Sequence, residues 1–163
     1  MSDPQFDART SRAGSFVAAV VAWIAWIGAL IAQPLLRVAL AIPFFRSGLT
    51  KWDGISLSPS ARYLFENEFK LHILGTAYDF PLPTVAAFGS AIGEIVLPIL
   101  LVIGLATRFA ALGILAMTIV IQLTVPEGWL IYHLPWAAMA LALMALGAGP
   151  FSLDRLIARR VAY

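Results

Sequence analysis

Cysteine is absent from all 163 residues of the chain. Its absence excludes disulfide bonds, thiol–disulfide exchange, cysteine-ligated zinc and cysteine-held iron–sulfur clusters. The chain also lacks a glycine-rich phosphate loop, a nucleophile elbow and the helix motif of metalloproteases. We therefore favour a protein without intrinsic catalytic activity, although these absences alone leave that question open.

Charged residues are scarce, at 12% of the chain against about 25% in soluble domains. Hydrophobic residues make up 61%, more than one water-soluble domain of this size could bury. The composition indicates a membrane protein with room for four or five helices of about 20 residues each. The formal charge is only +2 and the basic residues are scattered, so nucleic-acid binding has no support.

The first apolar segment covers residues 16–45. A helix of this length measures about 45 Å, more than the ~30 Å of bilayer hydrocarbon. The segment fits one tilted helix, a helix kinked at Pro34, or a separate element over residues 16–32 lying partly in the interface. We favour one long, bent helix. The polar residues 1–15 lack the pattern of a cleaved signal peptide, so we expect a cytoplasmic tail before a retained anchor.

Three further apolar segments, residues 83–106, 109–125 and 129–146, are each long enough to cross a bilayer. The connections between them are very short, which makes sequential helices antiparallel neighbours. We therefore predict an all-α membrane protein. Its fold is a four-transmembrane-helix bundle over residues 16–150 with an extended first helix.

A polar connection over residues 46–82 is too long to be a bare loop. Ser58-Pro59-Ser60 is a helix-start signal, and we predict a short amphipathic helix over residues 61–71 that lies on the bilayer or caps the bundle. The residues at helical spacing are Leu64, Phe65, Phe69 and His72.

The last segment, residues 151–163, has the pattern of a short basic amphipathic helix capped by Ser152. Its apolar face is Leu153, Leu156, Ile157 and Val161. Most basic residues near the spans fall on the side of the two termini: Arg9, Arg12, Arg108, Arg155, Arg159 and Arg160. The positive-inside rule then places both termini in the cytoplasm.

Two charged residues, Arg37 and Glu94, lie inside long apolar runs. Because a charge in hydrocarbon is costly, such residues face the protein interior and usually have a partner. We predict that Arg37 and Glu94 pair across two helices, with Arg37 reaching the membrane surface as the alternative. Glu94 is the leading candidate for a proton or quinone-headgroup site, and a structural bond that fixes helix register is equally open.

Other candidate residues are weaker. Gly89 and Gly93 lie four apart beside Glu94, and with Gly48 they are expected to let helices approach closely. His133 begins the last span and suits proton transfer or quinone binding, or a plain interfacial role. A zinc, copper or haem site would also need His72, and nothing in the spacing supports one. The cations Arg46 and Lys51 end the first span and suit an anionic group or simple anchoring.

The sequence resembles the DoxX family of small bacterial membrane proteins. The resemblance covers about residues 34–156 and rests on three stretches: LLRVALAIPFFRSGLTKW, IGEIVLPILLVIGLATRFAAL and YHLPWA. The family pattern matches at Arg37, Gly48, Lys51, Glu94, Gly104, Arg108 and His133.

The resemblance implies a multi-pass protein of the bacterial cytoplasmic membrane, associated with quinone-linked oxidases. We therefore expect an accessory subunit of a quinone-linked membrane redox system, in which quinone is the candidate cofactor and no metal site is expected. Two alternatives stay open: an export or accessory component for a copper-binding peptide, and a non-catalytic scaffold. The expected partners are the lipid bilayer and a membrane or periplasmic protein, and a homo-oligomer is compatible with the sequence.

Overall fold

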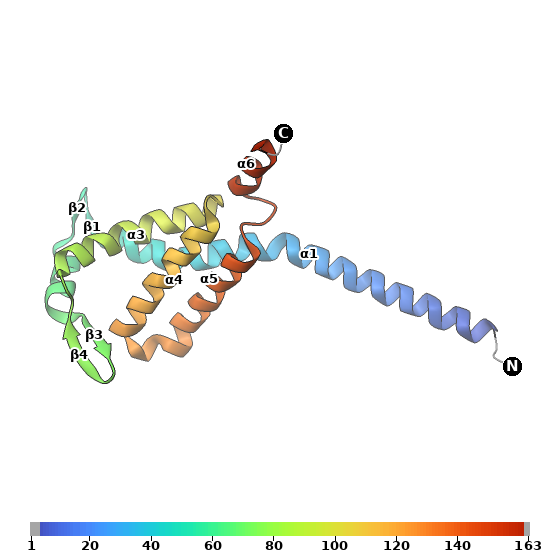
Figure 1. Ribbon diagram of the computed structural model, residues 1–163, viewed down its shortest axis with the longest axis horizontal. Helices are drawn as coiled ribbons and strands as arrows, with labels where there is room; N and C mark the ends of the chain where they lie inside the picture. The colour runs from blue at the N-terminus through green and yellow to red at the C-terminus, as the bar shows by residue number, and fades with distance from the viewer. Residues whose placement is uncertain (1–3, 162–163) are drawn as a thin grey trace. The chain divides into compact units, whose positions relative to one another are not determined.

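The computed structural model describes residues 4–161, with side chains from residue 14 onward. The outermost residues of the two predicted tails therefore lie outside the described residues. The chain divides after Ala32 into two units. Helix α1 (Pro4–Thr50) contributes to both, so the favoured prediction of one long helix agrees with the structure, which extends it five residues past the expected end (Figure 1).

The first unit is an apolar helix without a core of its own. Its side chains from residue 14 to residue 26 are all exposed. Two of them, Trp23 and Trp26, are each 63% exposed. This exposure is expected in lipid, because a helix that is apolar on every face would expose hydrophobic side chains to water on all sides in solution.

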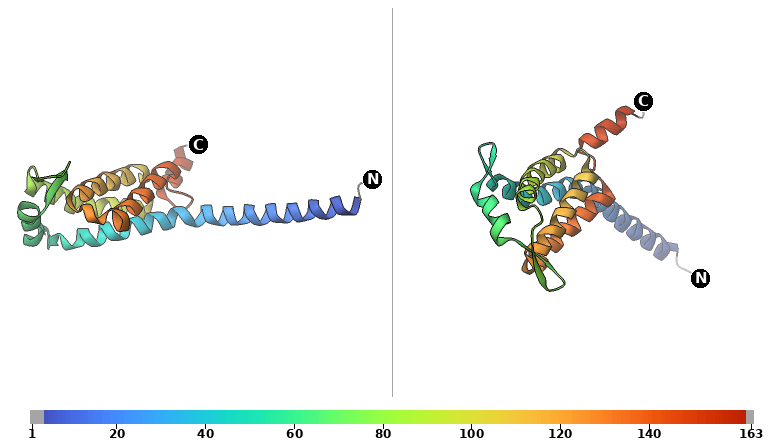
Figure 2. Two further views of the ribbon diagram at one scale, coloured as in Figure 1. Left: turned by 90° about the horizontal axis from the view of Figure 1, so that it is seen from below. Right: turned by 60° about the vertical axis from the view of Figure 1, so that its left-hand side comes forward.

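The second unit is the predicted helix bundle. Helices α3 (Pro83–Ile103), α4 (Thr107–Thr124) and α5 (Leu134–Leu146) pack in sequence with residues 33–50 of α1 (Figure 2). A 3₁₀ turn and a π turn precede α5 and extend the last apolar segment back to Pro126. Among residues 4–161, four helical segments are long and apolar enough to cross a membrane, which confirms the predicted fold class.

The bundle core consists of small and branched side chains from all four segments. Leu40 and Phe44 of α1 meet Leu101 of α3, Ile114 of α4 and Leu143 of α5. These five side chains are at most 2% exposed. Many large apolar residues on the outer faces of the same helices are exposed, as expected where lipid is the solvent.

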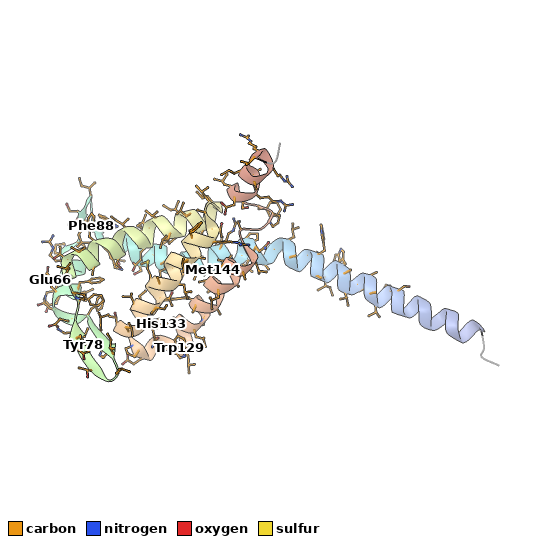
Figure 3. All side chains as sticks on the ribbon, in the orientation of Figure 1. Glu66, Tyr78, Phe88, Trp129, His133 and Met144 are labelled. Atoms are coloured by element: carbon orange, nitrogen blue, oxygen red, sulfur yellow. The ribbon has the colours of Figure 1, made fainter. Side chains whose placement is uncertain are left out.

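The polar connection is built differently from the prediction. A two-residue hairpin pairs β1 (Trp52–Asp53) with β2 (Ser56–Leu57) and precedes α2 (Pro59–Tyr63) and a π turn, Leu64–Glu68. The expected helix over residues 61–71 therefore exists but ends early. A second antiparallel hairpin follows, β3 (Lys70–Ile73) with β4 (Thr76–Asp79), so His72 lies on a strand. Figure 3 labels Glu66 of the π turn and Tyr78 of β4.

The hairpin replaces the helix for local reasons. Phe69 has an extended backbone that ends the π turn, and Gly75 adopts φ +82° in the turn between the strands. Lys70 pairs with Asp79 across the hairpin, at opposite positions of the register. The helical spacing of Leu64, Phe65 and Phe69 therefore predicts the structure only up to the end of the π turn at Glu68, after which the chain is extended.

Candidate functional site

Glu94 lies in the middle of α3, where the helix faces the bundle, and its side chain is only 4% exposed. Ser90, one helical turn earlier, donates a hydrogen bond from its Oγ to Glu94 Oε1 at 2.9 Å. The other residues of α3 near Glu94 are mostly apolar and pack in the core or face lipid. Their packing fixes the orientation of the helix, which places the carboxylate in the interior. A buried carboxylate needs a cationic or hydrogen-bonding partner to offset its lost hydration.

That partner is Lys51, the first residue after α1. Lys51 Nζ donates to Glu94 Oε2 at 2.5 Å and to Ser47 Oγ at 3.0 Å, with only 14% of the lysine side chain exposed. Two of the three N–H groups of the ammonium are thereby used within the described chain. The two opposite charges offset each other, so the site is close to neutral while keeping donors and acceptors in place.

Gly48 permits this pairing. A Cβ atom at Gly48 would lie 2.8 Å from the backbone oxygen of Glu94 and 2.9 Å from Cδ1 of Ile95. The backbones of α1 and α3 therefore touch at this point, where any side chain would separate them. Trp52 adds a second link, since its Nε1 donates to the backbone oxygen of Ala91 at 3.3 Å.

A cavity of about 700 Å³ opens beside the pair, and Lys51, Ser47, Ser90 and Glu94 form its polar wall. Apart from Thr124, the rest of its lining is apolar and comes from α1, α3, α4, α5 and the polar connection. The cavity exists partly because α3 presents Ala86 and Gly89 toward it. A Cβ at Gly89 would have no heavy atom within 4 Å. Gly89 was expected to pack against a helix, and its open surroundings correct that expectation, whereas Gly93 lies against Met117.

The polar connection covers one side of this cavity with aromatic rings. Phe65 packs edge to face against Phe69 and Phe80, with ring centroids 5.2 and 5.3 Å apart, and all three line the cavity. Strand β3 is fixed to α4 through His72, whose Nδ1 lies 3.1 Å from the backbone oxygen of Leu123. The 46–82 connection is therefore a lid built onto the bundle.

Arg37 does not pair with Glu94, so that prediction was wrong. Its Nη2 donates to the backbone oxygen of Phe151 at 2.6 Å, and its Nη1 lies against Gly104. Gly104 is ten residues after Glu94, which corresponds to about 15 Å of helix. Arg37 thus lies at the C-terminal end of α3, where Asp154 supplies the opposite charge.

The role of Asp154 could not be recognised from residue patterns. Its two carboxylate oxygens accept hydrogen bonds from the backbone N–H groups of Ala106 and Thr107, at 2.7 and 2.9 Å, at the start of α4. A carboxylate at a helix N-terminus satisfies donors that have no partner within the helix. Three buried polar atoms in this cluster, Arg37 Nε, Arg37 Nη1 and Thr107 Oγ1, have no partner among the described residues.

His133 is buried at the start of the last span, close to Trp129 in the chain (Figure 3). The Nε2 of Gln122 donates to the backbone oxygen of Pro126, which leaves its Oε1 to accept from His133 Nδ1 at 2.6 Å. His133 and His72 thus bind separate groups of α4. Within the described residues, no three histidine or carboxylate side chains come together as metal ligands would.

The remaining candidate cations are peripheral. Arg46 is exposed near the end of α1. Arg108 is also exposed, and its Nη2 donates to the backbone oxygen of Ala145 at 3.3 Å. The structure therefore gathers Glu94, Lys51 and Gly48 into one site and leaves Arg37, His133, Arg46 and Arg108 outside it.

Comparison with known proteins gives one family and one relative. Residues 28–127 match the DoxX family. An uncharacterized protein of Haemophilus influenzae is 32% identical over 140 residues, which cover 80% of this chain and 86% of that protein. No solved structure matches the chain.

Proposed function

Because this chain belongs to the DoxX family of membrane proteins, we propose that it is an accessory subunit of a quinone-linked membrane redox system. In this proposal the cavity beside Lys51 and Glu94 holds the ring of a quinone. The observation that carries it is a largely apolar, aromatic-lined cavity of about 700 Å³ whose charged groups, Lys51 and Glu94, lie together on one wall.

The cavity suits such a ligand in size and character. Sites for small molecules commonly measure about 300–1,000 Å³ and combine an apolar lining with a few fixed polar groups. A quinone ring is flat and apolar and carries two carbonyl oxygens. Lys51 has one N–H beyond its bonds to Glu94 and Ser47, which is available to a carbonyl oxygen. Glu94 and Ser90 offer acceptors for the hydroxyl groups of the reduced form.

The proposed role is accessory because the chain supplies few groups for electron transfer. It has no cysteine to hold an iron–sulfur cluster. Its two histidines bond to different positions of α4, and His133 is buried against Gln122. A bound quinone would supply the redox chemistry, and the residues of this chain would bind and orient its ring and keep water from it. The electron donor would be a partner protein.

A test is to fill the cavity without disturbing the fold. We expect Gly89→Phe to place its ring in the open space beside Ser90 and Glu94, since no heavy atom lies near a Cβ at that position. The protein is purified from native membranes into lipid nanodiscs, and co-purified small molecules are extracted and identified by mass spectrometry. The wild type should retain quinone in an amount comparable to the protein, and Gly89→Phe should lose most of it.

The matched control is Gly28→Phe. Gly28 is also a helical glycine at which an added Cβ would have no heavy atom within 4 Å, and it belongs to the first unit and not to the cavity lining. This variant should retain quinone like the wild type. Equal retention in all three proteins, or no quinone in the wild type, would refute the proposal.

A further inference from the structure

Helix α6 (Leu153–Val161) has two different faces, and none of its residues is buried. At 100° per residue, Leu153, Leu156, Ile157 and Val161 fall within one side of the helix, and they are 39–80% exposed. Arg155 and Arg159 lie on the opposite side. Arg160 falls within the apolar side, where its long side chain reaches outward along the helix surface.

The start of α6 is fixed firmly to the bundle. Ser152 Oγ accepts from the N–H of Arg155 at 3.3 Å and donates to the backbone oxygen of Gly149 at 2.9 Å. The backbone N–H of Asp154 donates to the backbone oxygen of Gly104 at 2.9 Å, while its carboxylate binds the start of α4. Arg37 holds the backbone oxygen of Phe151. The helix is therefore held in position at its first turn, with its apolar face left open.

Position and charge indicate what meets that face. The last span ends at Leu146 and α6 begins at Leu153, so α6 starts where the bundle leaves the hydrocarbon. Figures 1 and 2 show it turning away from the direction of α3 next to the junction of α3 and α4. The helix carries three arginines and one carboxylate, that of Asp154, which already accepts hydrogen bonds from the start of α4. The outward charge is positive.

We infer that α6 is a lipid-binding helix that lies in the headgroup layer of an anionic bilayer. Its apolar face inserts among the upper acyl chains, and its arginines contact lipid phosphates. An amphipathic helix with these two faces binds membranes through apolar burial and attraction to anionic lipids together. The anchoring by Asp154 and Arg37 connects this lipid contact to the interior of α1, to the C-terminal end of α3 and to the start of α4. The inference does not depend on the quinone proposal.

The absence of cysteine makes this testable at single sites. The full chain carrying Ile157→Cys, on the apolar side, or Ala158→Cys, on the polar side, is labelled with an environment-sensitive fluorophore. Each protein is placed in nanodiscs of phosphatidylcholine with phosphatidylglycerol. Lipids bearing a nitroxide on the upper acyl chain should quench the label at position 157 several-fold more than the label at 158. Aqueous iodide should show the reverse order.

Two further measurements complete the test. Replacing Arg155, Arg159 and Arg160 with glutamine, or omitting phosphatidylglycerol, should reduce the lipid quenching at position 157. Equal quenching at the two positions, or access of iodide to position 157 in anionic nanodiscs, would overturn the inference. A label at 157 that neither quencher reaches would indicate that a protein surface covers the face, which also overturns it.

Discussion

Because Gly48 contacts α3 closely, we predict that Gly→Ala changes the free energy of unfolding in opposite directions at Gly48 and at Gly89. Glycine inside a helix normally costs about 0.5–1 kcal/mol relative to alanine, so Gly→Ala usually stabilises. At Gly48 the new methyl group would lie 2.8 and 2.9 Å from the backbone oxygen and carbon of Glu94. These atoms belong to a helix backbone, so α1 and α3 must move apart locally.

Overpacking of this kind costs about 1–3 kcal/mol. After the gain in helix propensity, we expect Gly48→Ala to lower the free energy of unfolding by about 1–2 kcal/mol. The same substitution at Gly89, where the methyl group meets no atom within 4 Å, should raise it by about 0.5–1 kcal/mol.

The assay is reversible unfolding in mixed micelles, with helicity followed by circular dichroism as the denaturing detergent is increased. Gly28→Ala serves as a second reference, since its surroundings are also open. If Gly48→Ala and Gly89→Ala shift the midpoint in the same direction and by similar amounts, the close approach of α1 and α3 at Lys51 and Glu94 is not present, and the site as described fails.

Three other sets of substitutions test the polar contacts by the same unfolding assay. Lys51→Met should cost about 3–5 kcal/mol because it leaves Glu94 buried without its cation, and adding Glu94→Gln should recover part of that loss; additive costs would count against the pair. Asp154→Ala removes the acceptor for two N–H groups of α4 and should cost about 1–2 kcal/mol, whereas an unchanged midpoint would argue against this cap. Gln122→Leu should cost about 1–3 kcal/mol because it leaves buried His133 without a partner, and a neutral result would show that His133 has another one.

Much of the architecture could be predicted from residue types alone. Long apolar runs separated by two or three polar residues can adopt few structures in a bilayer, because every backbone polar group must be hydrogen-bonded inside the segment. The spans and their antiparallel order followed from this, and the helix after Ser152 followed from its serine cap and its amphipathic spacing. The hairpin at residues 70–79 did not, since the spacing of Phe65, Phe69 and His72 fits a helix as well as the observed lid.

The sequence by itself determined that Arg37 and Glu94 must be buried and must find partners, because a lone charge in hydrocarbon is too costly. Only the tertiary structure decided which partners. Arg37 of α1 lies beside Gly104, ten residues after Glu94 on α3, and is therefore too far from the carboxylate. Lys51 pairs with Glu94 instead, and Arg37 binds the backbone oxygen of Phe151 near the C-terminus. The cavity likewise depends on the distance between packed helices. A residue pattern determines on which face of a helix each side chain lies. The distance between two packed helices is set by contacts such as that of Gly48 with α3.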